Sequence, residues 1–156
     1  MKLIPILIAA LLAAPCFAQT NSPAQVFSGK DVSAQMPVLI RQAKVQGSSG
    51  AKLADYGSHA IQLSVRAMSG GAELHSHFDD VFYVTQGHAT LVTGGSILNP
   101  KSHADGEVAG TGIENGQSRV ITKGDIVNIP AGTPHQVKVA PGDVYAAVVI
   151  KVRESK

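Results

Sequence analysis

Residues 70–87 read GGAELHSHFDDVFYVTQG. Glycines open and close this stretch, and a β-branched and aromatic run at 81–85 lies between them, which is the pattern of a strand bounded by turns. His75 and His77 are separated by one residue. On a strand two such residues point to the same face, with their Cα atoms about 6.6 Å apart. The stretch therefore predicts a strand that presents two imidazoles to one metal ion.

A second stretch, residues 124–135, reads GDIVNIPAGTPH and ends on His135. Taken in order, the two stretches resemble the two sequence motifs of the cupin superfamily. The resemblance covers about residues 51–152. It implies an all-β fold, a cupin-like jelly-roll β-barrel, with a metal ion inside the barrel.

The resemblance also implies a set of metal ligands. His75 and His77 match the paired histidines of the first motif, and His135 matches the histidine of the second. Asp80 stands where the family usually has glutamate, although the gap from His77 is one residue shorter than usual, and Asp79 is the competing acid. Imidazole ligands suit one divalent transition metal ion, whether Fe, Mn, Ni, Cu or Zn. The alternative is a set of buried barrel histidines that hold no metal.

The rest of the chain supports an all-β fold preceded by one short helix. Pro37 can occupy the first turn of a helix that ends by Gly47, after a polar lead-in at 19–34. Short β-rich runs punctuated by glycine or proline follow. We expect strands at 61–66, 81–85, 90–93, 120–122, 126–129, 136–139 and 144–152. The expected domain plan is a lead-in and helix at 19–50, a single barrel at 51–152 and a tail at 153–156.

Two features of this plan bear on the site. Residues 96–117 are polar, glycine-rich and aperiodic, so we expect a long inserted loop that forms a flap over one mouth of the barrel. His103 lies in this loop and is a weak candidate for a further ligand. In the run at 61–66 we expect the apolar positions to face the barrel interior. Arg66 would contact an anionic substrate only if the strand faced the opposite way.

The N-terminus predicts export. Lys2, an apolar run at 3–14 and a break at 15–18 with small residues at Cys16 and Ala18 form a signal peptide at 1–18. It places the mature protein in the periplasm or outside the cell. Lipidation at the lone Cys16 is the alternative, but Pro15 fits a lipidation box poorly. No later stretch has the roughly 20 apolar residues that a spanning helix needs, so we expect no membrane contact after cleavage.

Charge and motifs narrow the function. The net charge is only +2 and no basic block survives cleavage, so nucleic acid is excluded as a partner. We expect a small-molecule ligand or substrate and, by analogy, a homodimer. The preferred hypothesis is a metalloenzyme, with oxidoreductase chemistry favoured over isomerase or lyase chemistry. The alternative is a non-catalytic periplasmic module that binds a metal or a small ligand.

Overall fold

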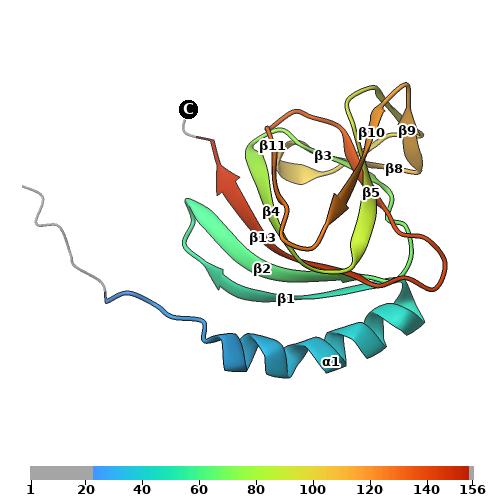
Figure 1. The fold of residues 1–156 in the computed structure, drawn as a ribbon. Helices are drawn as coiled ribbons and strands as arrows, with labels where there is room; N and C mark the ends of the chain where they lie inside the picture. The colour runs from blue at the N-terminus through green and yellow to red at the C-terminus, as the bar shows by residue number, and fades with distance from the viewer. Residues whose placement is uncertain (1–22, 155–156) are drawn as a thin grey trace, which may run out of the picture.

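The computed structural model describes residues 23–154, so the predicted signal peptide at 1–18 lies outside the described residues. Figure 1 shows one helix lying against a barrel of short strands. The elements in chain order are α1 (Gly29–Gln46), β1 (Ser48–Asp55), β2 (His59–Arg66), β3 (Ala72–His75), β4 (Phe78–Gln86), β5 (His88–Thr93), β6 (Ser96–Leu98), β7 (Lys101–Ser102), the 3-10 turn η1 (Ala104–Gly106), β8 (Glu107–Gly110), β9 (Gly112–Glu114), β10 (Gln117–Thr122), β11 (Ile126–Ile129), β12 (His135–Lys138) and β13 (Tyr145–Arg153). Among residues 23–154, no helix combines the length and the apolar character needed to cross a membrane.

Two antiparallel sheets form the barrel. One has the strand order β1-β2-β13-β4-β11, the other has the order β10-β5-β12-β3-β8-β7, and β6 pairs with β9 in a separate ribbon. Apolar side chains from both sheets meet between them in one cluster that includes Phe82, Leu91 and Val149. The predicted all-β class is confirmed, and strands occupy each of the seven predicted runs.

Helix α1 is longer than predicted. It begins at Gly29 because the Ser28 hydroxyl caps it by accepting the backbone N–H of Asp31 at 3.1 Å. It ends where Gly47, at a φ of 91°, turns the chain and donates its N–H to the carbonyl of Ala43. Pro37 therefore lies inside the helix and not in its first turn, and residues 29–34 of the predicted lead-in are helical. The capping serine, and not the proline, marks the start of the helix.

The helix determines which way β2 faces, and our prediction for that strand was wrong. Leu63 and Val65 point outward and pack against Leu39 and Ala43 of α1. In Figure 1 the helix runs along the outer face of β1 and β2. Because side chains alternate along a strand, the polar residues between them must point into the barrel. Three side chains of β2 accordingly line an internal cavity: Gln62, Ser64 and Arg66.

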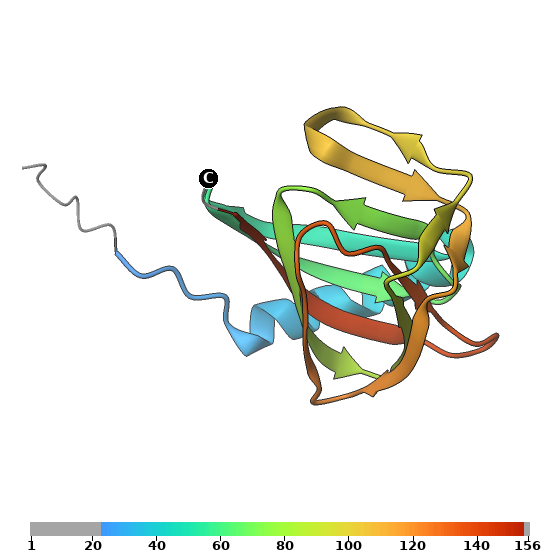
Figure 2. The same cartoon turned by 90° about the horizontal axis from the view of Figure 1, so that it is seen from above.

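The predicted loop at 96–117 is also wrong, because most of this segment is strand. Its glycines and asparagines make tight turns: Asn99 and Asn115 have φ values of 51° and 57°. Gly110 is required for close packing, since a Cβ there would lie 2.2 Å from the Ile97 side chain. Figure 2 shows this yellow and gold segment at the edge of the barrel, away from α1. The segment extends the second sheet, with β8 paired to β3.

Candidate metal centre

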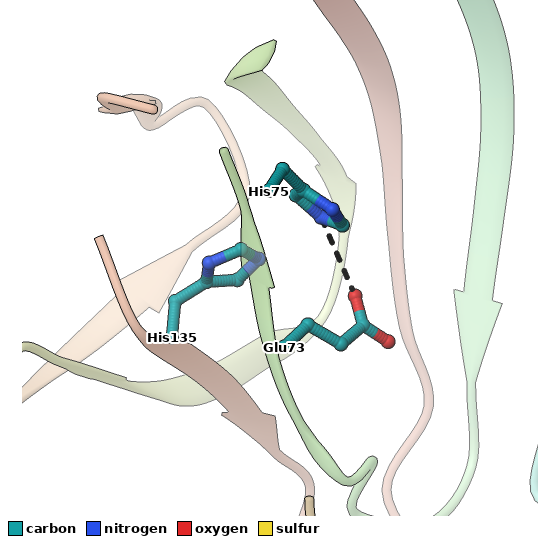
Figure 3. Close-up of side chains that lie close together, drawn as sticks. All are labelled: Glu73, His75 and His135. Atoms are coloured by element: carbon teal, nitrogen blue, oxygen red, sulfur yellow. Dashed lines mark ion pairs between the residues drawn. The ribbon is translucent and has the colours of Figure 1, made fainter. Parts of the chain in front are cut away.

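Strand β3 brings two ligand groups to one face. Glu73 and His75 are separated by one residue, so both side chains point into the barrel. The neighbouring strand β12 contributes His135, whose backbone is directly opposite Glu73 in the ladder. One ligand atom from each of the three residues lies within 4.8 Å of the others, a separation that a single metal ion can bridge. Figure 3 shows the two rings and the carboxylate converging.

A second carboxylate lies beside the two histidines. Asp80, from β4 in the opposite sheet, is only 5% exposed. Its Oδ2 lies 3.4 Å from Nε2 of His75 and 3.7 Å from Nε2 of His135. Two histidines and two carboxylates thus surround one point in the barrel, because Oε2 of Glu73 also lies 3.8 Å from Nε2 of His75.

The ring nitrogens provide the strongest test of whether these residues fit a metal. Nδ1 of His135 donates to the carbonyl of Thr133 at 3.0 Å, and Nδ1 of His75 donates to the Glu107 carboxylate. Each Nε2 is then left with a lone pair, and both Nε2 atoms are buried without a hydrogen-bond partner. Buried polar atoms normally have partners, and metal-bound histidines normally donate their other nitrogen to a carboxylate or carbonyl. The residues therefore fit a metal ion.

The protonation states follow from burial and charge. Burial lowers the pKa of His135, which keeps the ring neutral. Burial by itself raises the pKa of Asp80, but the neighbouring His75 and Lys151 outweigh it, so the pKa is lowered and the carboxylate is ionised. At His75 burial lowers the pKa, whereas Asp80 and Glu107 raise it, and the net pKa is raised. A metal ion at Nε2 would bind the neutral ring, so a proton and a metal ion compete for the same atom.

His77 lies apart from the cluster. Strand β3 ends at His75, and residues 76–77 form a bend. In this bend Nε2 of His77 lies 3.2 Å from the point where a Cβ on Gly106 would stand. The backbone carbonyl of His77 accepts the N–H of Glu154. The cluster therefore contains Glu73 and His75, whereas we had placed His75 and His77 there. If Glu73 and His75 are taken as the paired ligands, four residues separate His75 from Asp80. The spacing to the acid is then no longer one residue shorter than usual.

The structure also places the other predicted metal ligands. His75, His135 and Asp80 come together as predicted, whereas Asp79 accepts the backbone N–H of Ala131 at 2.8 Å. His103 is exposed at the start of the 3-10 turn.

Two residues that sequence reasoning missed complete the site. Glu73 could have been found from its position two residues before His75 on the same strand. Glu107 is adjacent to His75 only because β8 pairs with β3, and no local signal in the sequence predicts that pairing.

The cluster opens onto a cavity of about 80 Å³. Besides the cluster it is lined by polar and apolar side chains and by two cations. Arg66 lies 3.6 Å from Glu73, and Lys151 lies 3.5 Å from Asp80. Tyr145 is fully buried, and this burial raises the pKa of its phenol to about 12.

Comparisons with known proteins find similarity in structure alone. No protein-family model matches the chain, and no curated protein matches it in sequence. KdgF from a Halomonas species superposes with a TM-score of 0.51 at 15% identity, over 70% of this chain and 83% of that one. A predicted oxalate decarboxylase from Thermotoga maritima gives a TM-score of 0.51 at 12% identity, over 69% and 81% of the two chains. The polyketide cyclase RemF from Streptomyces resistomycificus gives 0.50 at 19% identity, over 70% and 67%.

Fold and site together define a class: a two-sheet antiparallel barrel with a cluster inside it, formed by histidines and carboxylates, that could hold a metal ion. These solved structures share the fold, and the cupin-like jelly-roll β-barrel that the two sequence motifs implied is confirmed.

Proposed function

We propose that this protein is an exported metalloenzyme that binds one divalent transition metal through His75, His135, Glu73 and Asp80 and acts on a small molecule. One observation carries the proposal: two buried Nε2 atoms without partners face the same point, while their Nδ1 atoms are held by Glu107 and Thr133. This is how proteins orient imidazoles toward a metal.

Within this proposal we prefer an oxidoreductase, because four of the five ions that the donor set suits, Fe, Mn, Ni and Cu, can change oxidation state. A bound ion of this kind would supply Lewis acidity or a redox centre, depending on whether it is Fe, Mn, Ni, Cu or Zn. The chain's own residues would exclude bulk water from the barrel and fix both rings. They would also neutralise charge, with Arg66 beside Glu73 and Lys151 beside Asp80. The three structurally similar proteins have different names, so the shared fold does not identify the reaction.

A second candidate is a non-catalytic metal-binding or small-ligand module. The observation that favours it is the number of ligands: two histidines and two carboxylates can close a tetrahedral site and leave no position for a substrate. The two candidates differ in whether the loaded protein binds and converts a small molecule.

Elemental analysis tests the metal. Protein purified without chelators should contain about one transition metal ion per chain, and a His75→Ala, His135→Ala double variant should contain almost none. His77→Ala is the matched control and should retain the metal, because His77 lies outside the cluster. Equal metal in the double variant and the wild type, or no metal in either, would refute the site.

Conversion of small molecules by the metal-loaded protein, followed by product NMR and oxygen uptake, then separates an enzyme from a binding module. Export is tested separately by sequencing the N-terminus of protein from a periplasmic fraction, where Gln19 should be the first residue. A homodimer, also proposed, would appear as twice the chain mass in analytical ultracentrifugation.

A further inference from the structure

The end of the cavity nearest Arg66 contains a polar group that the metal ligands leave unused. Tyr145 is only 2% exposed. Its hydroxyl has no hydrogen-bond partner, yet the residue lines the cavity. Burying a polar atom without a partner costs about 1–3 kcal/mol, so such an atom in a cavity indicates a ligand that pairs with it.

Arg66 lies beside Tyr145 at this end of the cavity. A Cβ at Gly70 would lie 2.2 Å from a guanidinium nitrogen of Arg66, so the guanidinium rests directly on that glycine. Tyr145 is directly opposite Arg66 in the ladder between β13 and β2, so both side chains point to the same face. The two side chains therefore border one small space.

The charges around the cavity favour an anion once a metal is bound. Three carboxylates, those of Glu73, Asp80 and Glu107, face two cations, Arg66 and Lys151, which leaves one negative charge. A divalent ion would change this to one positive charge. An anionic ligand would then be attracted into the low-dielectric barrel, where charge interactions are stronger than in water.

We infer that Arg66 and Tyr145 form a recognition subsite for a small carboxylate, beside the metal ligands. The carboxylate accepts hydrogen bonds from the guanidinium and the phenol. This inference rests on the proposed function, because it names the class of substrate for the same site.

The size of the cavity limits the ligand further. Its volume of about 80 Å³ is roughly half that of an engineered cavity of about 150 Å³ that holds benzene. An acid of two or three carbons fits such a space. Larger acids would have to extend toward the mouth of the barrel.

Calorimetric titration of zinc-loaded protein tests the subsite without turnover. Three probes of similar size test the charge: glycolate and acetate carry a carboxylate, and ethylene glycol carries none. We expect both acids to bind more tightly than ethylene glycol. Glycolate that binds no more tightly than ethylene glycol would overturn the inference.

Variants show whether the named residues are responsible. Arg66→Met should weaken glycolate binding roughly 10- to 100-fold, as expected for a charged hydrogen bond, and Arg66→Lys should restore part of it. The exposed Arg119→Met is the matched control and should bind glycolate as the wild type does. Tyr145→Phe should weaken binding roughly 3- to 10-fold. This variant guards against misfolding, because it removes only a hydroxyl that has no partner in the protein.

The zinc content of each variant distinguishes this inference from the proposed function. If zinc binds in full but Arg66→Met and Tyr145→Phe bind glycolate as tightly as the wild type, the subsite is refuted and the metal centre stands. If no zinc binds to the wild type, the proposed function fails. Titration of the metal-free protein then decides the subsite alone, since loss of glycolate binding in Arg66→Met would support it and equal or absent binding would refute it.

Discussion

Replacing Tyr145 with phenylalanine should change how stability depends on alkaline pH. Burial raises the pKa of Tyr145 from 10.0 to about 12, so the folded protein holds the phenol proton more tightly than the unfolded chain does. Stability from this group is complete below pH 10 and is lost as the pH rises from 10 to 12. At about 1.4 kcal/mol per pH unit, the loss is at most about 3 kcal/mol.

The assay is urea unfolding of wild type and Tyr145→Phe at intervals between pH 8 and pH 12. Lysine and other groups titrate in both proteins, so the difference between the two isolates Tyr145. The variant should be more stable by about 1 kcal/mol at pH 8, because a buried hydroxyl without a partner is removed. Its advantage should grow by roughly 2–3 kcal/mol toward pH 12.

Two results would refute this reasoning about Tyr145. A constant difference between pH 8 and pH 12 would mean that the phenol is not desolvated in the folded protein. A loss of stability at pH 8 would mean that the hydroxyl has a partner. Tyr83→Phe is the matched control, because it removes the hydroxyl of a tyrosine that is 50% exposed.

Three further predictions concern the metal and the helix. Chelation of the metal should lower the melting temperature by roughly 10 °C in scanning calorimetry. The reason is that an ion at 1,000 times its Kd stabilises the folded protein by about 4 kcal/mol. An unchanged melting temperature would argue against a metal in the folded protein. Glu107→Gln should weaken metal affinity about 10-fold, because it removes the charge beside Nδ1 of His75. Competition with a chelator measures this affinity, and Glu114→Gln, at an exposed position, should leave it unchanged. Leu39→Ala should lower the free energy of unfolding, measured in urea, by about 2–5 kcal/mol and leave the metal content unchanged. Val38→Ala, at a more exposed position of α1, should lower the free energy of unfolding far less.

Much of the fold and part of the site could be predicted from local pattern. The strands were visible in alternating residues and punctuating glycines, and two ordered motifs identified His75, His135 and Asp80. His77 was placed in the ligand set because the pattern does not show that β3 ends at His75, where the chain bends.

What could not be predicted depends on contacts between distant segments. Alternation in β2 defines two faces but not which one is internal; α1, by covering Leu63 and Val65, decides this. Glu107 reaches His75 across 32 positions of sequence, through the pairing of β8 with β3. A polar, glycine-rich composition resembles an irregular loop, although here the same residues provide the tight turns between short strands.

Strand β2 packs on α1 through its outer side chains and lines the cavity with its inner side chains, so packing and recognition use different residues of one strand. Leu63 and Val65 anchor the strand from outside, so the inner positions at Gln62, Ser64 and Arg66 carry little of its packing. Substitutions at these inner positions should alter what the barrel recognises with little penalty in folding. The helix thus makes the interior of this strand adaptable, and a library confined to those three positions is where new specificities should be sought first.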